Sequence, residues 1–179
     1  MENRERQPEI INMSKEEVIH YIIERYGEEI KRLIFTYVKS YAQTDDLFQE
    51  FLINTYKGLD RFHEQSSLKT WLYRIAINKC KDYLRSPFHR LFHFTDMEPL
   101  SKRDKSAEQV SMEREQQHQV VEAILSLPIK YREVVILKYY KDMSIQEIGQ
   151  MLGTNESTIK SRIMRGKEIL KKRGEDIFE

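Results

Sequence analysis

The segment Leu68-Lys-Thr-Trp-Leu-Tyr-Arg-Ile-Ala-Ile-Asn-Lys-Cys-Lys-Asp-Tyr-Leu-Arg85 has the spacing of a helix with two different faces. Its apolar residues recur every three or four positions and form a stripe suited to burial: Leu68, Leu72, Ile75, Ala76, Tyr83 and Leu84. A second stripe combines an aromatic ring, cations and an amide: Trp71, Arg74, Asn78, Lys81 and Arg85. Cations bind phosphate, a ring stacks on a base and an amide reads a base edge, so this face favours nucleic acid. From this segment alone, Trp71 could instead belong to the core and the cations to an ordinary solvated surface.

Length and composition predict an all-helical protein. The 179 residues suffice for one domain or two small ones. Six glycines and four prolines, without sustained alternation of apolar and polar residues, favour helices throughout. Cys80 is the single cysteine, so no internal disulfide can form, and no apolar run approaches the roughly 20 residues that span a bilayer. Because the N-terminus also has no apolar signal core, we expect a cytoplasmic location.

Positive charge is concentrated in two stretches, although the whole chain carries 30 basic and 29 acidic residues. Six cations and one acid lie between Lys69 and Arg90, and seven cations and one acid between Lys160 and Arg173. Two basic patches on a nearly neutral chain indicate two contact points on a polyanion. Cations scattered over helix surfaces would be the alternative explanation.

Residues 14–86 are predicted to form an N-terminal helical domain, preceded by a flexible arm of residues 1–13. Ser14 stands three residues before a glutamate, which is the spacing of a capping box and predicts a helix start. The apolar periodicity then continues past Gly27 to about Tyr41, as one helix or two. Later in this domain, Ser67 is expected to cap the helix of Leu68–Arg85.

A further helix is expected to begin at Thr44, whose hydroxyl suits an N-cap. Its buried stripe is expected to be apolar and aromatic: Phe48, Phe51, Leu52, Tyr56 and Leu59. The opposite face carries Asp46, Gln49, Glu50 and Ile53. An isoleucine exposed within a charged rim is either a single surface residue of the ordinary kind or the centre of a protein-binding patch.

Residues 87–112 show no clear period and are interpreted as a flexible linker to a C-terminal helical domain of residues 113–179. In that domain, Ser144 begins a second capping box, and Gly153 is placed to end the same helix in the left-handed conformation. A basic helix follows at once, so the pair has the layout of a helix-turn-helix.

The second helix of a helix-turn-helix lies in the major groove, and its N-terminal side chains reach base edges. We expect its cap at Thr154 or Asn155. The candidate reading residues are Glu156, Ser157, Thr158, Lys160, Ser161 and Arg162. Arg165 and the lysines after it would contact phosphates, which position the protein without reading sequence. Short helix pairs with a glycine turn also occur in bundles that bind no DNA, but the basic second helix favours DNA.

Five strings, in matching order and spacing, resemble the extracytoplasmic-function group of bacterial sigma factors. They are Asp45-Asp-Leu-Phe-Gln-Glu-Phe51, Leu68-Lys-Thr-Trp-Leu-Tyr-Arg-Ile-Ala-Ile-Asn78, Leu127-Pro-Ile-Lys-Tyr-Arg-Glu-Val-Val135, Ser144-Ile-Gln-Glu-Ile-Gly-Gln-Met-Leu-Gly153 and Ser157-Thr-Ile-Lys-Ser-Arg-Ile-Met-Arg-Gly166. The resemblance covers roughly residues 18–172. There are two departures. Thr154-Asn-Glu-Ser157 replaces the family's usual Ile-Pro-x-Gly turn, and Gly149 replaces its usual alanine, which would loosen the helix pair.

The resemblance implies a transcription initiation factor, without catalysis or cofactor, that directs core RNA polymerase to promoters and helps to melt the start-site DNA. It implies that Asp46, Gln49, Glu50 and Ile53 dock on the coiled coil of the polymerase's largest subunit. The proximal promoter element, locally melted, would contact Ser66, Ser67, Lys69, Trp71, Arg74, Asn78, Lys81 and Arg85. The helix-turn-helix would read the distal element as duplex. An anti-sigma factor, often anchored in the membrane, is the implied regulator, and no small-molecule substrate is implied.

Two metal-binding alternatives stay open from the residues alone. A nuclease could use three carboxylates: Asp45, Asp46 and Glu50. Acids at a helix start are common for capping and dipole reasons, so this spacing is weak evidence. A zinc site could use His89 and His93 with His63 or Cys80, although linker histidines without a ligand role are the ordinary case. We therefore expect no metal.

The remaining alternative is a stand-alone helix-turn-helix regulator in which residues 14–86 sense a signal or dimerise. The segment Leu68–Arg85 discriminates between the two functions. A sensing domain has no need of a second basic and aromatic face, whereas a sigma factor contacts DNA at two places.

Overall fold

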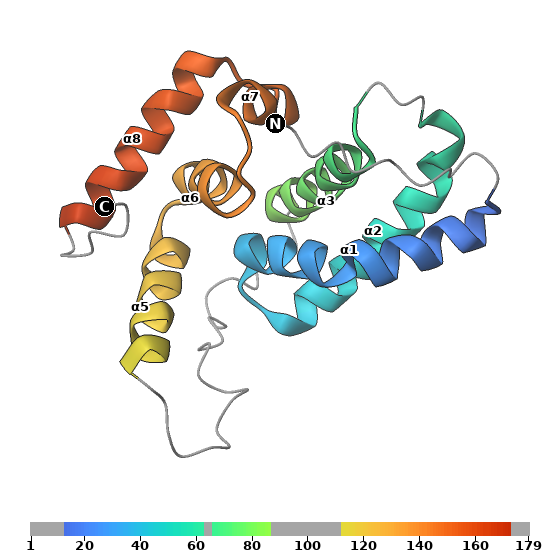
Figure 1. Ribbon diagram of the computed structural model, residues 1–179, viewed down its shortest axis with the longest axis horizontal. Helices are drawn as coiled ribbons and strands as arrows, with labels where there is room; N and C mark the ends of the chain where they lie inside the picture. Colours follow the sequence, from blue (N-terminus) through green and yellow to red (C-terminus); the bar gives the residue numbers. More distant parts are fainter. Residues whose placement is uncertain (1–12, 63–65, 87–111, 173–179) are drawn as a thin grey trace. The chain divides into compact units, whose positions relative to one another are not determined.

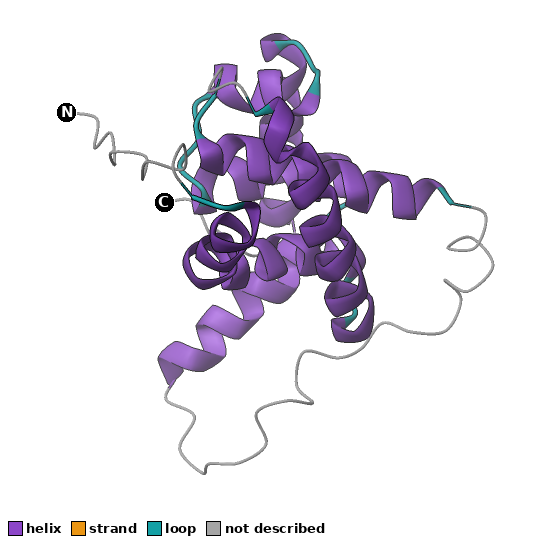
Figure 2. Ribbon diagram, turned by 90° about the vertical axis from the view of Figure 1, so that its right-hand side faces the viewer, coloured by secondary structure: helices purple, strands orange, loops and turns teal. Residues whose placement is uncertain are grey.

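The computed structural model describes residues 13–62, 66–86 and 112–172, with the side chains of residues 112–118 excepted. The chain divides after Met97 into two compact units, unit 1 and unit 2. Every regular element in the described ranges is helical, as Figure 1 and Figure 2 show, which confirms the predicted all-helical class. None of these helices combines the length and the apolar character that a membrane span requires.

Three long helices form unit 1, and each packs against the other two: α1 (Lys15–Val38), α2 (Tyr41–Gly58) and α3 (Leu68–Arg85). A 3-10 turn, η2 (Leu59–Arg61), follows α2. The side chains between the helices are apolar and fully buried, and include Ile22, Ile30, Ile34, Phe51, Leu72 and Ala76. Burial of this common core positions the outward faces of α2 and α3.

Two expected caps in unit 1 are confirmed, at Ser14 and Ser67. The Ser14 amide donates to the Glu17 carboxylate at 2.7 Å, and the Glu17 amide donates to the Ser14 hydroxyl oxygen at 3.2 Å. The Ser67 hydroxyl oxygen accepts from the Thr70 amide at 3.1 Å. Such caps need only partners three residues apart, so the sequence alone specifies them.

The start of α2 differs from the prediction. α1 runs through Gly27 without a break and ends at Lys39, whose φ is 56°. Ser40 then caps α2, and its hydroxyl oxygen accepts from the amide three residues on at 3.4 Å. Thr44, the predicted cap, is buried inside the helix, where its hydroxyl donates to the Ser40 carbonyl at 2.7 Å. A single left-handed residue is enough to redirect the chain, so α2 begins about one turn earlier than predicted.

The buried side of α3 is wider than the predicted stripe. Leu68, Leu72 and Ala76 are buried as expected. Three more residues are buried without having been predicted, namely Tyr73, Ile77 and Cys80, and three predicted ones are only half-buried, namely Ile75, Tyr83 and Leu84. α3 contacts both α1 and α2, so it buries an arc that one periodic stripe does not describe.

Tyr56, predicted in the buried stripe of α2, lies at the surface instead. Its side chain is 40% exposed, and its hydroxyl donates to the Glu16 carboxylate in the first turn of α1 at 2.8 Å. Lys15, beside it, pairs with Asp60 at 2.6 Å. A phenol can cover apolar surface and still bond at its polar end, so helical spacing does not decide whether a tyrosine is buried.

Unit 2 contains α5 (Met112–Ser126), α6 (Ile129–Val135), the π-helical turn η4 (Ile136–Tyr140), α7 (Ile145–Leu152) and α8 (Glu156–Lys172). α6 packs along α8, and the core of the unit includes Val134, Val135, Leu137, Ile148, Ile159 and Leu170, all fully buried. The predicted linker lies outside the described residues except for Met112, which begins α5, and the predicted N-terminal arm except for Met13.

Local signals specify the helix-turn-helix of α7 and α8. Ser144 and the glutamate three residues on form the expected capping box, with distances of 2.7 and 3.2 Å. Gly153 ends α7 with a φ of 63°, as predicted. Of the two expected caps of α8, the structure selects Asn155, whose side-chain oxygen accepts from the Thr158 amide at 2.8 Å. α8 therefore begins at Glu156.

Gly149 lies where the end of α7 approaches the turn that follows it. A Cβ at this position would lie 2.8 Å from the Thr154 carbonyl oxygen, and the Thr154 amide donates to the Gly149 carbonyl at 2.9 Å. The prediction that glycine loosens this helix pair relative to alanine is therefore wrong. The backbone approach leaves no room for the methyl group of alanine without a shift.

Candidate nucleic-acid interface

The outward face of α3 carries the residues predicted to bind the proximal element. Arg74, Asn78 and Arg85 are exposed at helical spacing, whereas Trp71 and Lys81 are half-buried. Two guanidinium groups and an amide thus share one side of the helix. This arrangement can attract phosphates and still offer a hydrogen-bonding group to a base.

Trp71 is half-buried and packs against unit 1, so it belongs partly to the core, and its contact with nucleic acid stays a prediction. Its ring centroid lies 4.9 Å from that of Phe62, with 42° between the ring planes. A Cβ at Gly58 would lie 3.1 Å from the Trp71 ring, so the glycine makes room for the indole. Phe62 is absent from the predicted site because an aromatic residue outside a helical stripe gives no periodic signal.

The serines before α3 differ in their surroundings. Ser67 is exposed, but its hydroxyl caps α3 and lies 2.8 Å from the Thr70 hydroxyl. Ser66 is half-buried. Starting the helix is therefore one established task of Ser67, and any DNA contact would be an additional one.

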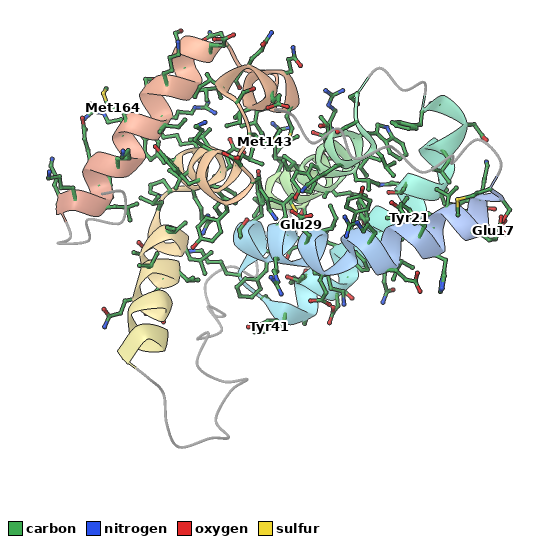
Figure 3. All side chains as sticks on the ribbon, in the orientation of Figure 1. Glu17, Tyr21, Glu29, Tyr41, Met143 and Met164 are labelled. Carbon is green, nitrogen blue, oxygen red and sulfur yellow. The ribbon has the colours of Figure 1, made fainter. Side chains whose placement is uncertain are left out.

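Lys69, at the start of α3, pairs with an acidic side chain of α1. The Lys69 ammonium lies 3.2 Å from the Glu29 carboxylate, which also accepts a hydrogen bond from the Tyr73 hydroxyl. Burial, and then this hydrogen bond, raise the pKa of the Tyr73 phenol, so it remains a donor. Glu29, labelled in Figure 3, thereby offsets the charge of Lys69, which helical spacing places about 180° around α3 from Asn78 and so off the face of Arg74, Asn78 and Arg85.

The face of α2 predicted to bind a protein is exposed as expected. Asp46, Gln49 and Glu50 are exposed, and Ile53 is 53% exposed. Glu50 forms an ion pair with Lys79 of α3 at 2.6 Å. An apolar centre with a charged rim is thus present, and one rim carboxylate is held from the neighbouring helix.

The described part of the chain contains no site for either metal-binding alternative. Asp45 pairs with Lys31 at 2.9 Å, and Glu50 is paired as described above. Among the described residues, no three histidine, cysteine, aspartate or glutamate side chains gather closely enough to hold a metal ion. Burial raises the pKa of the Cys80 thiol to about 12, which disfavours the thiolate that zinc binds. The other zinc candidates lie outside the described residues: His63, His89 and His93.

In unit 2, the outward face of α8 carries most of the residues predicted to read the distal element. The exposed members are Glu156, Ser157, Lys160, Ser161 and Arg165, and Thr158 is half-buried. The Ser157 hydroxyl donates to the Asn155 side chain at 2.8 Å, and Arg165 pairs with Glu168 at 2.9 Å. Because the cap places Glu156 and Ser157 in the first turn, these residues lie where a recognition helix reaches base edges.

Arg162 is the member of the predicted set whose side chain turns toward α6. Its guanidinium lies 3.5 Å from the Glu133 carboxylate, with side-chain exposures of 28% for Arg162 and 5% for Glu133. A cation beside a buried carboxylate offsets part of the cost of removing that charge from water. This contact makes Arg162 a link between α6 and α8, and its role as a base reader stays a prediction.

The same two helices approach closely one turn further on. A Cβ at Gly166 would lie 2.9 Å from a methyl carbon of Val135 and 3.6 Å from the Tyr131 Cβ. Gly166 is thus an unpredicted part of the packing between α6 and α8. Its absent side chain lets α8 pack close to α6.

Met164 is exposed on α8 but absent from the predicted set. It is 57% exposed, and Figure 3 shows it projecting from α8 on the side away from α6 and α7. Met164 carries neither a charge nor a hydrogen-bond donor, so it does not belong to the pattern of polar residues that predicts the site, although helical spacing places it one turn after Lys160 and Ser161.

Two family models match the chain, one in each unit. The model described as Sigma-70 region 2 matches residues 22–87, and the model described as Sigma-70, region 4 matches residues 117–170. The first contains α2 and α3, and the second contains the helix-turn-helix.

Relatives and a solved structure extend the match to nearly the whole chain. The ECF RNA polymerase sigma factor SigW of Bacillus subtilis (strain 168) is 30% identical over 167 residues, 87% of this chain and 88% of that protein. The ECF RNA polymerase sigma-E factor of Escherichia coli (strain K12) is 28% identical over 172 residues, 90% of this chain and 89% of that protein. The sigma factor RpoE from Bartonella quintana, solved in complex with the anti-sigma factor NepR, shares the fold, with a TM-score of 0.69, 20% identity and coverage of 87% of this chain and 96% of that one.

These matches agree with the five strings from which the resemblance was inferred. They set aside the nuclease and the stand-alone regulator, because the family consists of initiation factors and not of enzymes. The chain belongs to the extracytoplasmic-function group of sigma factors and directs RNA polymerase to promoters.

Proposed function

We propose that this chain is a dissociable initiation subunit that docks on core RNA polymerase through α2, melts the proximal element with α3 and reads the distal element with α8. The observation that carries the proposal is the difference between the outward faces. The face of α2 is acidic and centred on an exposed isoleucine, whereas the faces of α3 and α8 are rich in cations. The proposed site of action is the cytoplasm.

Docking is proposed on the coiled coil of the polymerase's largest subunit. Ile53 supplies an exposed apolar centre, and Asp46, Gln49 and Glu50 supply the polar rim. Lys79 holds the Glu50 carboxylate from α3, so part of this rim is organised before the partner arrives.

Capture of core polymerase on the immobilised chain tests the docking face. Ile53→Asp should abolish capture, because a charge replaces the apolar centre, and Glu50→Lys should do the same by reversing the rim. Ile23→Asp is the matched control, since Ile23 is a 41% exposed isoleucine on α1. All three variants should keep the helical circular dichroism of the parent. Full capture by Ile53→Asp would reject the docking assignment.

The proximal face is proposed to capture an unstacked base of the melted strand. The proposed contacts are Ser66, Ser67, Lys69, Trp71, Arg74, Asn78, Lys81 and Arg85. Extruding a base costs about a few kcal/mol, and stacking on an aromatic ring returns about 1–3 kcal/mol. The contact of Trp71 with Phe62 supports this role, because a ring that is already seated loses little freedom on binding a base.

Open-complex formation on two kinds of template tests melting. Trp71→Ala and Asn78→Ala should reduce it strongly on duplex promoters and weakly on promoters with a pre-melted bubble. Trp71→Phe keeps an aromatic ring and should lie between the parent and the alanine variant. Equal losses on duplex and bubble templates would count against a melting role.

The distal element is proposed to lie along α8, as duplex DNA. The proposed contacts are Glu156, Ser157, Thr158, Lys160, Ser161 and Arg165. Footprinting distinguishes an initiation subunit from a stand-alone regulator: both elements should be protected strongly only when core polymerase is present. A complete footprint by the chain alone, unchanged by core polymerase, would contradict the proposal.

An anti-sigma factor is the proposed regulatory partner. The support is that the Bartonella quintana structure with this fold was solved with one. The resemblance adds that such a partner is often anchored in the membrane. Affinity capture of the chain from its own cells in the resting state should retain one protein in preference to core polymerase, and retention of core polymerase alone would contradict this partner.

A further inference from the structure

We propose that Met164 is a specificity-determining residue for the distal promoter element and contacts the C5-methyl group of a thymine in the major groove. The proposal rests on the role proposed above for α8.

The position of Met164 on α8 is the first support. Its side chain is 57% exposed and projects on the side away from α6 and α7 (Figure 3). Helical spacing places it one turn beyond Lys160 and Ser161 and two turns beyond Ser157. All four residues therefore share the side of the helix that is opposite the buried Ile159.

The register along the groove is the second support. Met164 is seven positions after Ser157, which corresponds to about 10 Å along the helix axis. Base pairs follow one another at about 3.4 Å, so a helix that follows the groove carries Met164 about three base pairs beyond the pair next to Ser157. Met164 thus falls within the span of a single recognition helix.

The chemistry of the side chain then selects the target. A thioether has no donor and is a weak acceptor, so it cannot read the polar edge of a base. The apolar group that a base pair presents in the major groove is the thymine methyl. Methionine is flexible and polarisable, and it adapts to such a small apolar partner.

The surroundings separate Met164 from an ordinary exposed apolar residue. A single apolar residue at the surface needs no explanation by itself. Met164, however, has Lys160 and Ser161 on the turn before it and Arg165 next to it, all exposed. When Lys160, Ser161 and Arg165 bind phosphates or base edges, they bring Met164 against the floor of the major groove and exclude water around it.

Uracil substitution provides a test at the level of one methyl group. Holoenzyme assembled from the full chain and core polymerase first selects promoters from a library randomised over the distal element. Each thymine of the selected element is then replaced by uracil, which lacks only the methyl group. At one position, binding by the parent should weaken roughly fourfold, the effect of one methyl group. Binding of the Met164→Ala holoenzyme to the thymine template should be weaker than that of the parent by a similar factor, and uracil at that position should not weaken it further. Binding of the Met164→Leu holoenzyme should still weaken when uracil replaces that thymine.

Two outcomes would overturn the proposal: the same uracil effects in the parent and in Met164→Ala, or a selected element that contains no thymine. Lys160→Ala is the control, since it should weaken binding to thymine and uracil templates alike. If Lys160→Ala and Ser161→Ala also leave binding unchanged, the assignment of α8 itself fails. If those two variants weaken binding but the uracil effects are unaltered by Met164→Ala, only the methyl contact is refuted.

Discussion

Replacement of Arg162 by methionine tests whether this residue links α6 to α8 or reads bases. Arg162→Met keeps the aliphatic stem but leaves the Glu133 carboxylate, whose side chain is 5% exposed, without this cation. Hydrogen bonds to charged groups contribute about 1.5–3 kcal/mol to stability. The 3.5 Å separation and the 28% exposure of Arg162 place this pair near the lower end of that range. We therefore expect the free energy of unfolding to fall by about 1–2 kcal/mol.

Urea unfolding followed by circular dichroism measures this loss. Trp71 is the single tryptophan and lies in unit 1, so its fluorescence reports unit 1 and its transition should keep its midpoint. Arg165→Met is the matched control on the same helix. The side chain of Arg165 is 65% exposed and pairs with Glu168 at the surface, so its loss should change the unfolding free energy by less than about 0.5 kcal/mol.

Distal-element preference is the second readout for Arg162→Met. A misplaced α8 should weaken holoenzyme binding to all distal sequences by a similar factor. The reasoning is refuted if the unfolding free energy is unchanged while preference changes at one base pair, because Arg162 would then read that base pair.

Three further variants probe packing and burial. Gly166→Ala should destabilise unit 2, because the added Cβ would lie 2.9 Å from a Val135 methyl carbon. Such overpacking costs about 1–3 kcal/mol, which exceeds the gain of about 1 kcal/mol in helix propensity. A double-mutant cycle with Val135→Ala should recover part of the loss in unfolding free energy, and additive effects would show that the clash is absent. Gly149→Ala should lower the melting temperature, since its Cβ would lie 2.8 Å from the Thr154 carbonyl oxygen; an unchanged or higher melting temperature would show that the turn can yield. Cys80, whose pKa is raised to about 12 by burial, should resist thiol reagents at about pH 8 until urea unfolds the chain, and rapid labelling of the native protein would contradict that burial. The unfolded thiol loses its proton first as pH rises, so the stability that Cys80 contributes is present below its unfolded pKa and is lost as pH approaches 12. In urea unfolding, the free energy of unfolding of Cys80→Ala should therefore decline less steeply with pH over that window than that of the parent.

Helix boundaries were predictable from sequence where two neighbours in the chain make the cap. The boxes at Ser14 and Ser144, the cap at Ser67 and the left-handed Gly153 are all as predicted. Each depends on residues within one turn of each other, so no distant part of the fold is needed. The start of α2 is the exception, because Lys39 takes the left-handed conformation without any signal of glycine or asparagine.

Exposure of the candidate faces was also largely predictable. The residues proposed on α2 lie at the surface, as do most of those proposed on α3 and α8, because they alternate with buried residues at helical spacing; on α2 they are Asp46, Gln49, Glu50 and Ile53. What each side chain contacts was not predictable. Trp71 lies against Phe62, and Glu50 is paired with a lysine of another helix. Such contacts join residues that have no fixed spacing in the sequence.

The sequence by itself determined the all-helical class, the family, the helix caps and the polar sides of α2, α3 and α8, because these depend on local spacing and on motifs that the chain shares with its relatives. Only the tertiary structure decided which members of those sides are available to a partner. Arg162 and Met164 are two residues apart, which is about 200° around α8, so helical spacing already turns them to different sides. The contact of Arg162 with the buried Glu133 carboxylate of α6 joins residues that have no fixed spacing in the sequence, so only the tertiary structure decides that Arg162 is engaged while Met164 is exposed.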